Sequence, residues 1–293
     1  MLARRRRIEL MKERAVEFAK IYFRNRYGVA GLIILMIFVF MAVFAPYIAP
    51  YEPDDLFLAE PFSPPSPRFL LGTDELGRDI FSLMIYGAQT SLLVGILASI
   101  LTVLIGTLVG IYAGYYGGII QSILMRLTDF FLILPALPLM IVLAAILGPS
   151  IWNIILVIAI VSWPVTARVI MSQTLSVKES SYVEACRALG GSDTYIIFRH
   201  ILPNVTPLMF AYVILNIAGA VLSEAGLSFL GLGDPSHISW GMLLYYAHRF
   251  GALVSGLWWY IIPPGLAIAC LVLAFMMIGY ALDEIINPRI RRR

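Results

Sequence analysis

The chain has 293 residues, of which 60% are hydrophobic and 13% are charged, and its mean hydropathy is +0.87. Soluble domains are about half apolar and about a quarter charged, so this composition is typical of a membrane protein. Disordered chains and nucleic-acid-binding proteins are excluded because they need more polar sequence, and two cysteines are too few for a disulfide-stapled secreted fold. The net charge of +3 does not indicate a polyanionic partner.

Charge-free stretches predict an all-α membrane protein with six transmembrane helices, because a helix needs about 20 apolar residues to cross a bilayer core of about 30 Å. The expected spans are 28–49, 91–112, 128–147, 151–171, 205–222 and 260–280. The first span is too long for a cleavable signal and runs into aromatic and proline residues, so we expect it to remain as an anchor.

The lysine and arginine residues predict the orientation. Eighteen of the 21 fall on one side of the expected spans, in segments 1–27, 113–128, 168–203 and 281–293. The positive-inside rule therefore places both termini in the cytoplasm. Spans two to six form a core, 91–280, with a cytoplasmic loop at 172–203. The external loops are 50–90 and 231–257, and the basic tail 281–293 is cytoplasmic.

The cytoplasmic segment 1–27 carries a narrow apolar stripe on an otherwise charged helix. The stripe consists of Ile8, Met11, Ala15, Phe18 and Tyr22. It either lies on the inner membrane surface or packs on neighbouring helices, in which case the arginines at 4–7 only fix the topology.

The sequence contains no recognisable catalytic motif. A P-loop needs a lysine after glycine, and none of Lys12, Lys20 and Lys178 follows one. The three histidines are scattered, and no serine lies in a G-x-S-x-G motif. We therefore expect neither an enzyme nor a metal site.

Charged residues inside a bilayer are costly, so those in or beside the expected spans are candidates for function. Arg126 and Asp129 are three residues apart on one helix face, which favours a structural ion pair or snorkelling. Glu224, near the outer end of span five, either faces a pathway or reaches external water. Spans one, two, four and six are expected to lack charges at mid-depth, which disfavours a proton-coupled carrier.

The loop 172–203 predicts a short helix-turn-helix outside the membrane. Apolar residues from Val183 to Leu189 favour a first helix that ends at Gly190, Ser192 caps a second helix, and Pro203 precedes span five. A knob of this kind either fits a groove on a cytosolic partner or only connects two spans.

This loop resembles the E-A-A-x-x-x-G-x9-I-x-L-P motif of binding-protein-dependent ABC importer permeases. The matching residues are Glu184, Ala185, Gly190, Leu202 and Pro203. Cys186 stands in place of the second alanine, and His200 stands in the isoleucine position. Neither departure changes the spacing from glycine to proline.

Nearly the whole chain resembles the C-type permease of dipeptide, oligopeptide and nickel importers. The similar blocks are 25–26, 44–46, 71–79, 86–88, 90–92, 227–233, 239–241, 263–265 and 283–289.

One external block contains Gly72, Thr73, Asp74, Leu76, Gly77, Arg78 and Asp79. This block either contacts a binding protein or braces span two. Bracing is favoured because Arg78 can pair with Asp74 or Asp79 at little cost.

The resemblance implies the type I ABC importer permease fold in a prokaryotic inner membrane. It also implies four kinds of partner: a homologous second permease, two ATP-binding cassette subunits, an external substrate-binding protein and the lipid bilayer. No nucleic acid is expected. ATP and magnesium would be bound by the cassette subunits and not by this chain. The residues implied to couple to the ATPase are Glu184, Ala185, Cys186, Leu189, Gly190, Leu202 and Pro203.

Peptide is the default cargo that the resemblance implies. Nickel, glutathione and oligosaccharides are the alternatives, because members of the subfamily carry each of them and no charge cluster in the expected spans distinguishes among them. The rival functions are a stand-alone secondary transporter, which would move substrate without partners, and a membrane-embedded enzyme.

Overall fold

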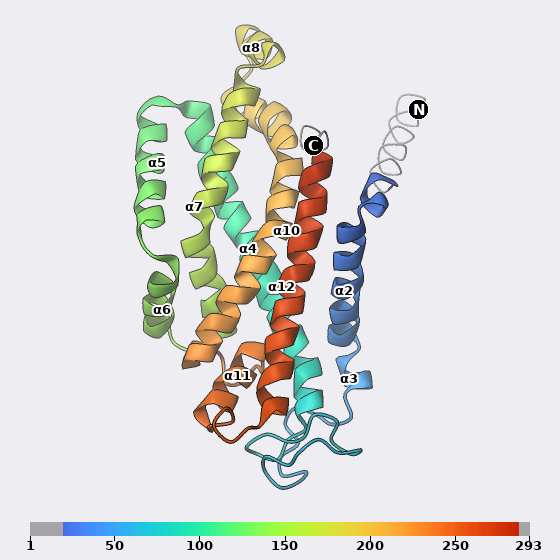
Figure 1. Cartoon of the computed structure of the whole chain (residues 1–293). Coiled ribbons are helices and arrows are strands. Elements are labelled where there is room, and N and C mark those ends of the chain that lie inside the picture. The colour runs from blue at the N-terminus through green and yellow to red at the C-terminus, as the bar shows by residue number, and fades with distance from the viewer. Residues whose placement is uncertain (1–19, 287–293) are drawn as a thin grey trace.

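A computed structural model describes residues 20–286 of the chain (Figure 1). Long helices run side by side in a bundle, with α8 (Ser181–Ala188) at one end and α11 (Trp240–Arg249) at the other. The first described residues and the last turn of the final helix lie at the α8 end (Figure 1). Within residues 20–286 there is no strand, only an isolated β-bridge between Thr73 and Asp79.

The other elements follow in chain order. They are α2 (Arg26–Val43), α3 (Ala45–Ile48), α4 (Ile80–Tyr116), α5 (Gly118–Ile133), α6 (Ala136–Leu147), α7 (Ile151–Lys178), α9 (Asp193–Ile196), η1 (Ile197–Ile201), α10 (Leu202–Leu227), η2 (Ser228–Leu232) and α12 (Trp258–Ile286). Five stretches are long and apolar enough to cross a membrane, and the bent pair α5–α6 is a sixth. The prediction of a six-span, all-α membrane protein is confirmed.

Several helices extend well beyond the predicted spans. The 37 residues of α4 begin at Ile80 rather than at Ser91 and correspond to about 55 Å at about 1.5 Å per residue. Bilayer thickness sets only the minimum length of a crossing, whereas the helix ends where capping groups are available. Asp79 accepts the Ser82 N–H at the start of α4, and Gly117 with φ +70° ends it. The predicted loop 50–90 is correspondingly shorter.

The first span consists of α2 and the short α3, with Pro46 in the first turn of α3. In Figure 1 it stands at the edge of the bundle beside α12. Glycine permits this contact, because a Cβ at Gly31 would lie 2.7 Å from the Ala274 carbonyl oxygen. The predicted N-terminal stripe lies outside the described residues except for Tyr22, whose hydroxyl donates to the Gly28 carbonyl at 2.9 Å. Residues 287–293 of the tail also lie outside them.

The third span is not the single helix predicted at 128–147. It consists of α5 and α6, which are bent by 93°. Leu134 between them is extended and precedes Pro135, and proline disfavours a helical conformation in the residue before it. The helix therefore breaks completely at this proline. Only Thr128, Met140 and Ala144 of the two helices are buried, so this arm lies on the surface of the chain.

The fifth span is continuous with the helix that precedes it. A single apolar helical stretch runs over 193–232 and includes the π-helical turns η1 and η2. The sequence predicted that Pro203 precedes the span. In the structure Pro203 lies in the first turn of α10. A proline is tolerated there because the wider π-helical turn changes the hydrogen-bond pattern around its missing N–H.

The centre of the bundle is formed by α4, α7 and α10. Glycines at 106, 110 and 114 of α4 face α7, where a Cβ would lie 2.7 Å from Thr166 Cβ, 2.6 Å from the Ala167 carbonyl oxygen and 2.8 Å from Thr174 Cβ, respectively. Small residues at every fourth position let two membrane helices approach closely and gain van der Waals contact.

Candidate functional site

The α8 helix protrudes from one end of the bundle (Figure 1). Val183 is its one buried side chain and has no exposed surface. It packs in an apolar cluster that also contains Ile111, Tyr115, Ile170, Val177, Ile196, Ile197, Ile201 and Val205. We call this set the anchor cluster. Because its members come from α4, α7, α9, η1 and α10, the cluster joins α8 to three spans at once.

The turn after α8 has the predicted geometry. Gly190 has φ +87°, a conformation that residues with a Cβ rarely adopt, and its N–H donates to the Arg187 carbonyl at 3.0 Å. A Cβ at Gly191 would lie 2.7 Å from Cys186 Sγ, so the turn closes tightly on the helix. Ser192 accepts the Tyr195 N–H, as expected for the cap of the next helix.

The seven predicted coupling residues fall into three groups. Four are exposed on α8 and its turn: Glu184, Ala185, Leu189 and Gly190. Cys186 and Leu202 are partly buried against the anchor cluster, and Pro203 is exposed at the start of α10. Leu189 is 89% exposed, and an apolar side chain at the tip of a protruding segment suits a protein contact.

A polar contact also connects this region to α4. The Tyr115 hydroxyl donates to Asp193 Oδ1 at 2.6 Å, and the Arg187 guanidinium lies 5.5 Å from the centre of the Tyr115 ring. Sequence reasoning missed this contact. Tyr115 and Asp193 are 78 residues apart, and neither belongs to a motif that indicates its partner.

At the opposite end, Asp74 organises the block 72–79. Its side chain has no exposed surface, Arg78 Nε donates to its Oδ2 at 2.6 Å, and the N–H groups of Leu76 and Arg78 donate to its Oδ1. The predicted pairing of Arg78 with Asp74 is confirmed. Asp79 instead accepts from the N–H and hydroxyl of Ser82, which caps α4.

Two glycines and a threonine shape the same block. Gly72 and Gly77 both have φ +70°, which favours glycine, and neither leaves room for a side chain. The Thr73 hydroxyl donates to the Glu60 carbonyl at 2.8 Å and accepts the Ser63 N–H at 2.9 Å. Partly buried hydrogen bonds therefore connect distant parts of this loop.

Glu75 connects this block to α12. The Tyr260 hydroxyl donates to Glu75 Oε2 at 2.5 Å, and Arg78 Nη2 lies 3.8 Å from Glu75 Oε1. Burial raises the pKa of the Glu75 carboxyl, an effect that the Tyr260 hydrogen bond opposes. The block thus contacts both α4 and α12, a geometry that agrees with bracing. The sequence separation of 185 residues hid the contact between Glu75 and Tyr260.

Glu224 does not reach external water, which was one of its two predicted surroundings. Its side chain is 1% exposed, and the Ser228 hydroxyl donates to its Oε1 at 2.7 Å. The chain then turns at Gly231, with φ +83°. A pathway role for Glu224 stays a prediction.

Asp129 pairs with a partner that was not predicted. Arg168 Nη2 lies 2.5 Å from Asp129 Oδ1, whereas Arg126 was the expected partner. Arg168 lies inside both the expected span 151–171 and the segment 168–203 whose charges were assigned to the cytoplasm. In the structure it lies inside α7, about 15 Å before the helix ends at Lys178. The apolar residues that follow it, Val169 to Met171, could have revealed this.

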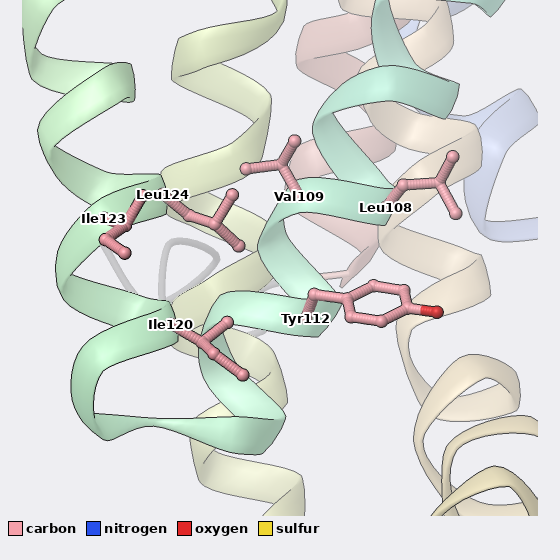
Figure 2. A pocket seen from close by; sticks show the side chains of 6 residues that line it. All are labelled: Leu108, Val109, Tyr112, Ile120, Ile123 and Leu124. Atoms are coloured by element: carbon pink, nitrogen blue, oxygen red, sulfur yellow. The ribbon is translucent and has the colours of Figure 1, made fainter.

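A groove of about 420 Å³ lies between α4 and α5. Figure 2 shows its lining: Leu108, Val109 and Tyr112 from α4, and Ile120, Ile123 and Leu124 from α5. This surface suits lipid tails or an apolar helix, and it offers no charge to a peptide. Among residues 20–286, no group of three or more histidine, cysteine, aspartate or glutamate side chains could hold a metal ion.

Comparisons with known proteins agree with this arrangement. Residues 106–292 match the family described as binding-protein-dependent transport system inner membrane component, and residues 15–65 match the N-terminal transmembrane domain of oligopeptide transport permease C. The chain is 36% identical over 282 residues to the di/tripeptide transport system permease protein DppC of Pseudomonas aeruginosa, covering 94% of this chain and 92% of that protein. It is 38% identical over 269 residues to a putative peptide permease protein of Brucella suis, with coverages of 92% and 89%. The chain therefore belongs to the family of binding-protein-dependent transport system inner membrane components, and within it to the C-type peptide permeases.

Proposed function

We propose that this chain is the permease subunit of an ATP-driven importer and forms half of the translocation pathway for dipeptides and oligopeptides. The observation that carries the proposal is α8, a helix that is exposed on one side and anchored by Val183 to three spans on the other. The names of the relatives, a di/tripeptide permease and peptide permeases, support peptide as the cargo.

In this proposal the α8 end of the bundle is cytoplasmic, in agreement with the excess of lysine and arginine on that side. Two ATP-binding cassette subunits contact α8 and bind ATP and magnesium, and this chain is not catalytic. A homologous second permease completes the pathway, and an external binding protein delivers the cargo at the α11 end.

The anchor cluster gives a route for coupling. When the cassettes close on ATP they move α8, and Val183 passes this displacement to the packed side chains of α4, α7 and α10. The hydrogen bond between Tyr115 and Asp193 adds a second connection to α4. The two permeases then alternate between states that open the pathway to one side or the other.

Substitutions on α8 test this proposal in the assembled complex. Glu184→Lys or Gly190→Pro should abolish cargo-stimulated ATP hydrolysis and leave membrane insertion intact, since Glu184 is exposed and Gly190 has φ +87°. Glu179→Lys is the matched control, because Glu179 is also an exposed glutamate but lies before α8. Unchanged stimulation in both α8 variants would contradict the coupling role.

The partners and the cargo have their own test. The tagged chain, purified from native membranes in mild detergent, should bring down a second six-span permease and P-loop ATPases, identified by mass spectrometry. Recovery of the chain alone would favour a secondary transporter. Reconstituted complexes should take up labelled dipeptide, and uptake of nickel, glutathione or an oligosaccharide instead would replace peptide as the cargo.

A further inference from the structure

The helix α5 carries a polar stretch on one face, which lies between the exposed Ile119 and Ile133 of the same face. With about 100° between successive residues, Ser122, Arg126 and Asp129 fall on one face at i, i+4 and i+7. Ser122 and Arg126 are exposed, and the Asp129 side chain is 50% exposed. Ile120 lies nine residues before Asp129, which places it on the opposite face, and it lines the apolar groove of Figure 2.

The neighbouring helix α7 continues the polar surface. Arg168, Ser172 and Ser176 are spaced by four residues, so they form a stripe along α7, and all three are exposed. The Arg168 side chain is 53% exposed, and its contact with Asp129 joins the two stripes. We call the combined surface the polar wall; its residues are Ser122, Arg126, Asp129, Arg168, Ser172 and Ser176.

The polar wall begins at the α8 end and extends along α5 and α7 toward the middle of the bundle. Arg168 lies about 15 Å from the end of α7 at Lys178, and Asp129 lies about 17 Å from the start of α5 at Gly118. Charges inside membrane-spanning helices almost always face other protein or a water-filled cavity rather than lipid. The half-exposed pair therefore marks a side of α5 and α7 that lipid does not cover.

We propose that the polar wall lines a hydrated part of the translocation pathway and that Asp129 and Arg168 contact the charged termini of a peptide. The carboxylate of Asp129 suits an α-ammonium group, and the planar guanidinium of Arg168 suits an α-carboxylate through paired hydrogen bonds. The choice of peptide rests on the proposed function, whereas the hydration of the wall rests on its own residues.

Thiol accessibility tests the hydration. In the assembled complex with Cys186→Ala and Cys270→Ser, single cysteines are placed on the wall (Ser122→Cys, Ser172→Cys) and in the apolar groove (Ile123→Cys, Leu108→Cys). A charged, membrane-impermeant methanethiosulfonate should modify the wall positions at least about tenfold faster in inside-out vesicles. Equal rates at both kinds of position, or faster reaction in the groove, would overturn the proposal.

Transport measurements test the contact with cargo. Asp129→Asn and Arg168→Gln should each reduce uptake of a dipeptide with free termini at least about tenfold, with much less effect on an N-acetylated, amidated dipeptide if that is carried. The exchanged pair, Asp129→Arg with Arg168→Asp, should re-form the ion pair and leave the complex assembled, but it should not restore uptake. Full uptake by the exchanged pair would show that the ion pair is only structural and would overturn the contact.

The two proposals fail in different ways. If the wild-type complex takes up no peptide while the wall cysteines still react faster, the hydrated wall stands and the peptide cargo is wrong. If peptide is taken up but wall and groove cysteines react alike, the proposed function stands and the inference about the wall is wrong.

Discussion

At the end of the bundle that carries α8, one buried side chain, Val183, holds the protruding helix to the spans. At the opposite end, the block 72–79 is held by a buried ion pair, by backbone hydrogen bonds to Asp74 and by the contact between Glu75 and Tyr260. Apolar contacts tolerate small displacements, whereas buried charges and hydrogen bonds require fixed geometry. The α8 end is therefore suited to transmit motion, and the block to resist it.

Among the substitutions that test this difference between the two ends, removal of Asp74 should lower the stability of the protein most. Asp74→Ala leaves the buried Arg78 without its nearest carboxylate, and breaking a buried ion pair on one side costs about 3–5 kcal/mol of unfolding free energy. Thermal unfolding of the purified complex measures the loss. Asp54→Ala, at an exposed position of the same loop, is the control and should leave unfolding unchanged. Equal unfolding of both variants would mean that the block does not brace the fold.

Truncating Val183 should have an intermediate effect on stability and a larger one on coupling. Val183→Ala removes part of one buried side chain, which costs about 1–2 kcal/mol. Because Val183 is the buried contact of α8, cargo-stimulated ATP hydrolysis should fall more than the melting temperature does. Leu189→Ala, at an 89% exposed position, should leave the melting temperature unchanged. Coupling that survives in Val183→Ala would assign transmission to the Tyr115–Asp193 contact instead.

The smallest effect concerns pH. Burial raises the pKa of the Glu75 carboxyl above its ordinary value, so the folded state holds this proton more tightly than the unfolded state does. The contribution of this proton to the stability of the folded state is fully present below the ordinary pKa of about 4.3. It is lost as pH rises through the raised pKa of Glu75. Glu75→Gln should remove this part of the pH dependence. The melting temperature, measured from about pH 4 to about pH 8, checks this expectation. A parallel pH profile in the variant would contradict the assignment.

Local features of both ends were predictable from the sequence. The turn at Gly190, the cap at Ser192 and the pairing of Arg78 with Asp74 each involve residues close together in the chain. Backbone preferences and short-range charge pairing determine such features. Hydropathy was likewise sufficient for the number of spans, because the bilayer requires long apolar helices.

Contacts between distant segments were not predictable. The Asp129–Arg168 pair depends on how α5 is rotated against α7, and hydropathy does not determine the rotation of a helix about its axis. The same limit hid the contact between Glu75 and Tyr260. The break after Leu134 was not predictable either, because proline produces either a bend or a complete interruption, and packing decides between them.

The glycines at 106, 110 and 114 have a mechanical consequence. At each glycine, backbone or side-chain atoms of α7 occupy the space that a Cβ would fill. Sliding one helix along the other would therefore bring these α7 atoms against the larger side chains of α4. This packing fixes the register of α4 and α7, and the two helices behave as one rigid unit. If α8 is displaced as the proposed function requires, α4 and α7 should therefore tilt together rather than slide along each other.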